Sequence, residues 1–245
     1  MITFFIPIFN EEKNLDSFFV KLKSFIKKTK INNNFIIIDD GSSDKSEEKI
    51  NKFILNLDYK LKKRIIFIKN DFNRGVGYSF KVALSKSDKE FIFFLPSDND
   101  IEFENLGNLN NYKKLDLIMM YPINFEKYSK YRYLLSMLFR MIYCFTFDVR
   151  ANYIQSPCLY RISKLKNINI ISNRFGIWPE INVKLLRSNI IYAELPIIFK
   201  NKSIIDRTVS FKNFIEITFN YLKLINEIFI NNKSKYKNVA KKKYL

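Results

Sequence analysis

The segment FIIIDDGSSD, residues 35–44, joins an apolar run to a cluster of carboxylates and small polar residues. A second segment, FIFFLPSDND at residues 91–100, has the same order. Short apolar runs of this kind are typical of buried strands in a parallel sheet. Because open α/β sheets bind ligands at their carboxyl edge, both acidic clusters are expected at a binding edge. Carboxylates gathered there suit a hard cation and the diphosphate that it neutralises.

Strand-like and helix-like patterns alternate through the first half of the chain. Five strands are predicted, at residues 2–8, 35–38, 65–68, 91–95 and 115–121. Helical spacing of apolar residues is found at 11–26 and after the DDGSSD segment, where Ser42 or Ser43 is expected to cap the helix. The NRGVG turn of residues 73–77 is expected to open a further helix that runs through residue 84. This alternation predicts βαβ units and an α/β fold with a mainly parallel sheet.

The second half is less regular but has no linker and no internal repeat. Helices are predicted at 131–147, 178–187 and 211–230, and extended segments at 156–161 and 190–195. We therefore expect one domain over residues 1–230 and a basic tail over 231–245. The tail has six Lys and no acid between residues 233 and 243, and a solvated tail is favoured over a docking one.

Composition limits the chemistry. The 245 residues have a formal net charge of +18 and include no His. The positive charge implies an acidic partner, which could be a nucleic acid, an anionic membrane surface or a phosphorylated substrate. The lack of His excludes Ser-His and Cys-His nucleophilic pairs and His-bound metals. Any metal must be held by oxygen, which favours Mg²⁺ or Mn²⁺, and Cys144 and Cys158 are too few for a disulfide framework.

Two segments bear on membrane association. The first residues do not resemble a secretory signal, and no apolar stretch reaches the ~20 residues that a spanning helix needs. Residues 133–147 and 214–230 come closest, and they predict amphipathic helices that are buried or lie on a membrane surface. The expected location is the cytoplasm, at the inner face of the cell membrane.

Each acidic motif alone has an ordinary structural explanation. The NEE of residues 10–12 makes a fair helix start, DDGSSD a capped turn, and DND at 98–100 an acidic turn. Their joint occurrence in this order and at these spacings favours a functional site.

Together these motifs resemble an inverting glycosyltransferase of family 2 with the Rossmann-like GT-A fold. The resemblance rests on PIFNE at 7–11, with Phe in place of the usual Tyr, on DDGSSD at 39–44, on NRG at 73–75 and on DND at 98–100. It implies a nucleotide-sugar donor and a metal, Mg²⁺ or Mn²⁺. The implied donor-binding residues are Pro7, Phe9, Glu11, Asp39, Asp40 and Asp98, and the implied metal ligands include Asp98 and Asp100.

The second half is similar, more loosely, to polyprenyl-phosphate sugar transferases of the dolichyl-phosphate mannose synthase type. This resemblance makes Glu102 a third metal ligand. It also implies that Arg132 and Arg140, on an amphipathic helix, orient a lipid phosphate. Glu180 is the candidate general base if the acceptor is a hydroxyl. The family's closing Arg-x-x-Gly-x-Ser-Lys motif is degraded at residues 207–212.

The leading hypothesis is a metal-dependent transferase in cell-envelope polysaccharide biosynthesis. Its nucleotide-sugar half would cover residues 1–122 and its acceptor half 123–230. The acceptor would be membrane-associated, either a polyprenyl phosphate or a growing cell-surface glycan. An inactive scaffold and a sugar-phosphate nucleotidyltransferase remain alternatives. A nucleic-acid partner is disfavoured, because most aromatic residues fall in apolar runs.

Overall fold

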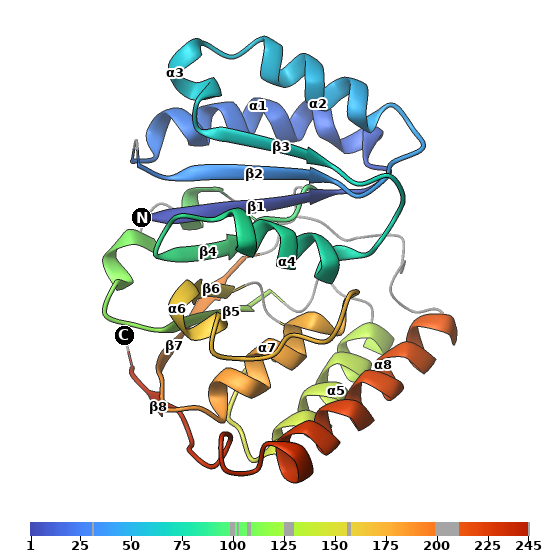
Figure 1. Cartoon of the computed structure of the whole chain (residues 1–245), viewed down its shortest axis with the longest axis vertical. Coiled ribbons are helices and arrows are strands. Elements are labelled where there is room, and N and C mark those ends of the chain that lie inside the picture. The colour runs from blue at the N-terminus through green and yellow to red at the C-terminus, as the bar shows by residue number, and fades with distance from the viewer. Residues whose placement is uncertain are drawn as a thin grey trace.

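An eight-stranded sheet runs through the molecule, with helices on both of its faces (Figure 1). The computed structural model describes residues 1–30, 32–98, 101, 103–106, 109–124, 130–155, 158–198 and 211–244. The strand order is β3-β2-β1-β4-β6-β5-β7-β8. Strand β6 is antiparallel to its neighbours β4 and β5, and the other pairs are parallel. The predicted α/β fold with a mainly parallel sheet is confirmed.

The strands are β1 (Ile2–Ile8), β2 (Asn34–Asp39), β3 (Ile65–Lys69), β4 (Phe91–Phe94), β5 (Leu117–Pro122), β6 (Cys158–Arg161), β7 (Ile191–Ile197) and β8 (Lys241–Lys242). The helices are α1 (Glu12–Lys28), α2 (Ser46–Leu55), α3 (Tyr59–Lys62), α4 (Val76–Lys86), α5 (Lys130–Phe147), α6 (Ile162–Leu165), α7 (Ile177–Leu186) and α8 (Phe211–Ile225). Short 3-10 turns follow β4 at η1 (Phe103–Leu106) and η2 (Leu109–Tyr112), and a π-helical segment, η4 (Asn226–Asn231), extends α8.

The sheet separates two apolar cores. Successive side chains of a strand point to opposite faces, so neighbouring residues of β1 enter different cores. Phe4 packs on Phe25 of α1, with ring centroids 5.1 Å apart. Phe5 packs on Phe80 of α4 at 5.7 Å. The first core holds α1 and α2, and the second holds α4, α5, α7 and α8.

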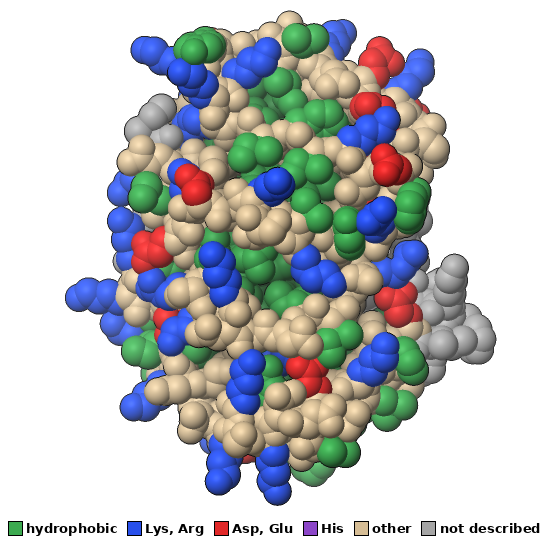
Figure 2. All heavy atoms as spheres, viewed as in Figure 1, with side chains coloured by type: hydrophobic (Ala, Val, Ile, Leu, Met, Phe, Trp, Pro, Cys, Tyr) green, Lys and Arg blue, Asp and Glu red, His purple; other side chains and the backbone are tan. Residues whose placement is uncertain are grey.

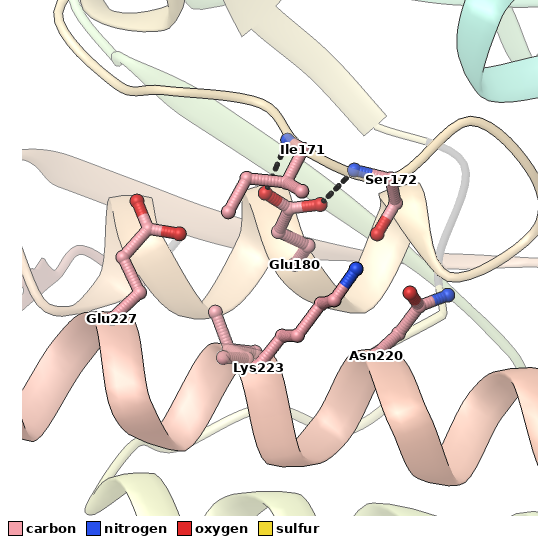
Figure 3. Close-up of a pocket in the computed structure, with 7 residues that line it drawn as sticks. Ile171, Ser172, Glu180, Asn220, Lys223 and Glu227 are labelled. Atoms are coloured by element: carbon pink, nitrogen blue, oxygen red, sulfur yellow. Dashed lines mark hydrogen bonds between the residues drawn. The ribbon is translucent and has the colours of Figure 1, made fainter.

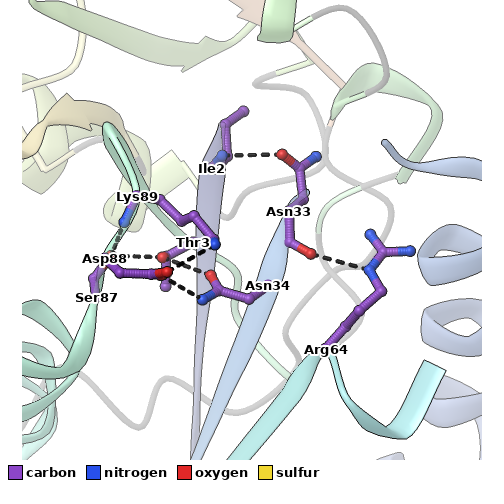
Figure 4. Close-up of polar contacts among 8 residues, drawn as sticks. All are labelled: Ile2, Thr3, Asn33, Asn34, Arg64, Ser87, Asp88 and Lys89. Atoms are coloured by element: carbon purple, nitrogen blue, oxygen red, sulfur yellow. Dashed lines mark hydrogen bonds and ion pairs between the residues drawn. The ribbon is translucent and has the colours of Figure 1, made fainter. Parts of the chain in front are cut away.

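The amino-terminal edge of the sheet is occupied by structural hydrogen bonds (Figure 4). Asn33 Oδ1 accepts from the Ile2 N–H at 2.9 Å, and the Asn33 carbonyl accepts from Arg64 Nε at 3.0 Å. Asn34 accepts from the Thr3 hydroxyl at 2.7 Å and donates to Asp88 at 3.0 Å. These contacts join the starts of β1, β2, β3 and β4, and the opposite edge carries the acidic motifs.

The expected cap of α2 by Ser42 or Ser43 is wrong. Helix α2 begins at Ser46, whose N–H donates to Asp44 Oδ1 at 2.9 Å. Ser42 Oγ instead accepts from the Asn10 N–H at 3.0 Å, and the Ser43 N–H donates to Asn10 Oδ1 at 2.9 Å. Both serines therefore bind the loop that follows β1, because a tertiary partner replaces the local one.

The basic tail keeps most of its lysines exposed, but its backbone also packs against the domain, which the prediction of a solvated tail did not include. Tyr236 is only 1% exposed and joins the second core. Lys241 and Lys242 form β8 and pair in parallel with Ile191 and Tyr192 of β7. The Lys242 ammonium forms an ion pair with Glu194. The backbone of the tail thus completes the sheet.

Across the described ranges, no helix combines the length and the apolarity that crossing a bilayer requires.

Candidate functional site

The carboxyl ends of β1, β2 and β4 meet at one edge of the sheet. Strand β1 is parallel to both of its neighbours, and its Ile8 is in register with Asp39, the last residue of β2. Beyond β4, the Ser97 hydroxyl donates to the Pro7 carbonyl at 3.1 Å, which holds the segment leading to Asp98 beside β1. Sequence-predicted residues from three separate motifs therefore lie at this edge.

Phe9 and Glu11 come from the loop after β1. The Phe9 side chain is 41% exposed, which leaves its ring accessible at the edge. Glu11 is directed towards α1, where its Oε2 accepts from Asn14 Nδ2 at 2.6 Å. Its backbone N–H donates to the Ser46 hydroxyl at 2.9 Å, so Glu11 helps to join this loop to α2.

Asp39 carries an unsatisfied acceptor. The side chain is fully buried, and its Oδ1 accepts from the Ser42 N–H at 3.0 Å. Its Oδ2 has no hydrogen-bond partner among the residues that the structure describes. A buried carboxylate oxygen without a donor costs about 1–3 kcal/mol, so such an atom at a binding edge points to a donor supplied by a ligand.

Asp40 is adjacent to Asp39 but is fully engaged within the protein. Its Oδ1 accepts from Asn70 Nδ2 at 2.7 Å, the Ser79 hydroxyl at 3.2 Å and the Arg74 N–H at 3.2 Å. Its Oδ2 accepts from the Gly75 N–H at 2.8 Å. These four bonds hold the turn between β3 and α4, which makes Asp40 a positioning residue for that turn.

Two glycines allow this edge to pack closely. Gly41 and Gly75 have φ values of 72° and 92°, which favour glycine over other residues. A Cβ on Gly41 would lie 2.5 Å from the Phe72 backbone. A Cβ on Gly75 would lie 2.5 Å from the Asn173 carbonyl oxygen. The turns after β2 and β3 and the loop before α7 are therefore in direct contact.

Arg74 is a cation in this turn that the sequence analysis left without a role. Its guanidinium lies 4.7 Å from the ring centroids of both Phe72 and Tyr78, and its Nη1 donates to the Tyr78 hydroxyl at 2.8 Å. A cation fixed by two rings beside a carboxylate edge suits an anionic ligand. The spacing of Arg74 and Tyr78, four residues apart at a helix start, was the signal available in the sequence.

The expected metal ligands are only partly within the described residues. Asp98 is exposed just after β4, where a carboxylate oxygen fits a hard cation. Asp100 and Glu102 lie outside the described residues, as does Asn99. Over the described ranges, no three carboxylates or cysteines converge as a metal site. The three-ligand set thus stays a prediction.

Glu180 is buried at the start of α7 and faces the loop before that helix (Figure 3). Its two oxygens accept from the N–H groups of Ile171 and Ser172, each at 2.8 Å. Lys184 Nζ lies 2.6 Å from Glu180 and 2.7 Å from Glu227 of η4. Two buried carboxylates therefore share one fully buried ammonium, which ties α7 to the end of α8.

The loop held by Glu180 supports the turn after β3. Within it, the Asn173 carbonyl accepts from the Tyr78 N–H at 3.0 Å. Asn173 Oδ1 accepts from Lys81 Nζ at 2.5 Å, and partial burial lowers the pKa of Lys81. These contacts give Glu180 a structural task, and its role as a base stays a prediction.

Arg140 and Arg132 both belong to α5. Arg140 Nη1 donates to the Asn152 carbonyl at 3.4 Å. Arg140 also lines a surface pocket with residues from α5 and the following loop, namely Tyr133, Ser136, Met137, Asn152 and Tyr153. The side chain of Arg132 lies outside the described part of the chain. One of the two predicted phosphate-binding arginines is therefore placed at a pocket.

Comparison with known proteins identifies a matching family. The model described as "Glycosyl transferase family 2" matches residues 3–168. An "Uncharacterized glycosyltransferase" of Haemophilus influenzae is 30% identical over 120 residues. This alignment covers 49% of the chain and 45% of that relative, so the chain spans less than half of the relative's length.

Solved structures are similar in fold at low sequence identity. S. aureus TarS 1-349 in complex with UDP-GlcNAc is 19% identical, with a TM-score of 0.59 over 94% of this chain and 66% of that one. Glucosyl-3-phosphoglycerate synthase from Mycobacterium tuberculosis, in complex with Mg²⁺ and UDP, is 11% identical, with a TM-score of 0.64 over 92% and 79% of the two chains. These likenesses show a GT-A-like fold, as predicted.

Proposed function

Because the chain belongs to glycosyl transferase family 2, an inverting family with the GT-A fold, we propose that it transfers a sugar from a nucleoside-diphosphate sugar to an acceptor. The observation that carries the proposal is the unsatisfied Oδ2 of Asp39 at the edge shared by Pro7 and Asp98. Residues 1–122 form the donor half in this proposal, and residues 123–230 form the acceptor half.

The proposed nucleotide base is uracil. Asp39 Oδ2 is an acceptor that needs an N–H donor, and uracil presents one at N3. The exposed ring of Phe9 offers a stacking surface at the same edge. Both solved structures described above hold a uridine nucleotide, which supports the choice of uracil over guanine.

The donor's diphosphate is proposed to lie next to Asp98. Asp98, with Asp100 and Glu102, would hold Mg²⁺ or Mn²⁺ here, and the M. tuberculosis synthase structures contain one or the other ion with UDP. A bound ion of this kind neutralises charge on the leaving nucleoside diphosphate. Arg74 adds a fixed cation at the neighbouring turn, and Asp40 keeps that turn in place.

The proposed acceptor is membrane-associated, and polyprenyl phosphate is favoured over a growing cell-surface glycan. A lipid phosphate is already anionic and needs no base, whereas a sugar hydroxyl does. The two backbone bonds and the ion pair of Glu180 fit the acceptor that requires no base. Arg140, at its pocket, and Arg132 would then orient the phosphate at the inner face of the membrane.

Donor binding tests this proposal directly. The protein would be titrated with UDP-, GDP- and dTDP-linked sugars in the presence of Mn²⁺ or Mg²⁺, and the affinity followed by calorimetry and thermal shift. We expect metal-dependent binding of a UDP-sugar. Asp39→Asn exchanges the unsatisfied acceptor for an N–H donor, so affinity should fall at least about tenfold while stability changes little.

Two further variants test the metal dependence of donor binding and provide a control. Asp98→Ala should remove the metal dependence, and Glu48→Ala, an exposed acid on α2, should bind as the unchanged protein does. Binding of no donor by a folded protein would favour an inactive scaffold. Binding of a nucleoside triphosphate together with a sugar phosphate would favour nucleotidyl transfer.

A further inference from the structure

The outer face of α5 is apolar where a helix of a soluble domain is ordinarily polar. Its exposed large side chains recur at helical spacing along the whole element. Phe145 is the extreme case, with 92% of its surface exposed. The exposed residues of this face are Tyr131, Leu134, Leu138, Met141, Ile142 and Phe145. The opposite side of α5 is also apolar, since Tyr143 and Phe147 are buried in the second core.

A second exposed apolar face lies on α8 and its π-helical extension. Phe219, Leu222, Phe229 and Ile230 are exposed there. On the inner side, Leu224 and Ile228 are buried in the same core as Tyr143. Both elements therefore have apolar residues on two sides, and only one side is covered by the described protein.

The two helices lie side by side, so their exposed faces belong to one region of the surface (Figure 1). The Thr146 and Tyr221 hydroxyls are 2.6 Å apart, and the rings of Tyr143 and Tyr221 are 5.1 Å apart. The rings of Phe147 and Phe229 stack at 6.0 Å. In Figure 2, hydrophobic side chains reach the surface at the lower right, where Figure 1 draws α5 and α8.

Positive charge accompanies this apolar surface. Lys130 at the start of α5 is exposed, and the exposed Lys233 and Lys235 follow η4. Residues 130–147 contain no acid. The acids of α8 and η4 are already paired, Glu216 with Arg174 and Glu227 with Lys184. Apolar side chains accompanied by exposed lysines match the chemistry of an anionic phospholipid surface.

We propose that α5 and α8 form an interfacial docking face, through which the protein binds the surface of an anionic lipid bilayer. The apolar side chains would enter the region between headgroups and acyl chains, and the lysines would contact lipid phosphates. A second copy of the chain is disfavoured as the occupant, because symmetric pairing would bring two positively charged faces together.

This inference deepens the proposed function and rests on it only for the identity of the acceptor. The pocket of Arg140 is lined by Tyr133 and Ser136 of the same helix. A bilayer bound at the outer face of α5 would thus lie along the helix that carries that pocket. Docking itself requires no transferase chemistry, so binding to vesicles and binding to the donor can be tested separately.

The test is flotation of the full chain with phosphatidylcholine vesicles, with and without phosphatidylglycerol, at low and high salt. We expect binding that requires the anionic lipid and weakens with salt. Phe145→Glu and Leu222→Glu place a charge on the docking face, and each should lower vesicle affinity at least about tenfold. Leu55→Glu, at an exposed apolar position on α2, is the matched control and should bind normally.

Each outcome decides the proposal. Equal vesicle binding by Phe145→Glu, by Leu222→Glu and by the control would overturn it. So would a dimer of the unchanged protein that Phe145→Glu converts to a monomer, since the occupant would then be a second copy. Normal UDP-sugar binding by Phe145→Glu would separate loss of docking from loss of donor binding. Vesicle binding without any donor binding would sustain the docking face and remove the transferase proposal.

Discussion

Neighbouring carboxylates in one motif have different tasks in this protein. Asp39 keeps a buried oxygen without a described partner, and Asp40 directs both of its oxygens to four protein donors. The difference arises because Asp39 ends a strand at the sheet edge, whereas Asp40 reaches the turn after β3. A free acceptor suits recognition, and a satisfied one suits positioning.

The buried bonds of Glu180 can be tested by a single substitution. Glu180→Gln removes the charge that faces Lys184 and sets an amide N–H against a backbone N–H of the 171–172 segment. Breaking a buried pair in this way should lower the free energy of unfolding by about 3 kcal/mol. If Glu180 only positions the loop, the pH dependence of turnover by the folded variant should stay unchanged. Urea unfolding and the pH–rate profile are the two measurements.

Glu227→Gln is the matched variant, since Glu227 shares Lys184, whereas the N–H groups of residues 171 and 172 donate to Glu180. Its cost in stability should be smaller than that of Glu180→Gln. A Glu180→Gln protein that keeps its stability but loses about a hundredfold or more in turnover would instead identify a general base.

The sequence indicated where carboxylates gather but not which of their atoms are free. The partners of Asp40 come from residues 70–79, and those of Glu180 include N–H groups nine and eight positions earlier in the chain. No pattern in the neighbouring sequence indicates these hydrogen-bond partners of Asp40 and Glu180. The ring contacts of Arg74 are local instead, and the spacing of Arg74 and Tyr78 could have indicated one of them.

Among the elements, strands and most helices begin within two residues of their predicted positions, and α2 is the exception. Apolar runs that enter two cores leave few alternative positions for a strand along the sequence, and β1 and β3 fall within one residue of expectation. Helix α2 started later than expected, because Ser42 and Ser43 bind the loop after β1. Strand β8 could not be foreseen, since its pairing with β7 depends on a long-range return of the chain.

The turn between β3 and α4 depends on the backbone conformation of Gly75, which a substitution can test. Gly75 combines a φ of 92° with an N–H bonded to Asp40 and close contact with the Asn173 carbonyl. Gly75→Ala should therefore lower the free energy of unfolding by about 2–3 kcal/mol. Because the displaced turn adjoins Asp40, UDP-sugar affinity should fall as well. Chemical unfolding and calorimetry with the donor would measure both effects.

Gly176→Ala is the control for that turn. Gly176 has a φ of −60°, and an added Cβ would meet only the end of the Asn220 side chain, which can move. We expect a change within about 0.5 kcal/mol, as for most substitutions that avoid backbone strain. Equal losses for the two alanine variants would show that strain at Gly75 is not what constrains the turn.

At the scale of the whole molecule, a lysine-rich segment completes the fold. Charge alone predicted a solvated tail, because one aromatic residue among lysines gives no periodic signal. Tyr236 provides the anchor, and the Arg187 guanidinium adds a hydrogen bond of 3.0 Å to its carbonyl oxygen. Lysine side chains can stay in water while the backbone pairs with β7, which reconciles the composition with the structure.

Two substitutions of Tyr236 test whether this anchor stabilises the domain. Tyr236→Ala removes a ring buried in the second core and should cost about 3–4 kcal/mol. Tyr236→Phe keeps the ring and removes a buried hydroxyl that has no partner within the described ranges, so stability should be unchanged or slightly higher. The comparison is made by urea unfolding of the full chain. If Tyr236→Ala unfolds at the same urea concentration as the unchanged protein, the tail rests on the domain without stabilising it, and the edge of β7 is stable without β8.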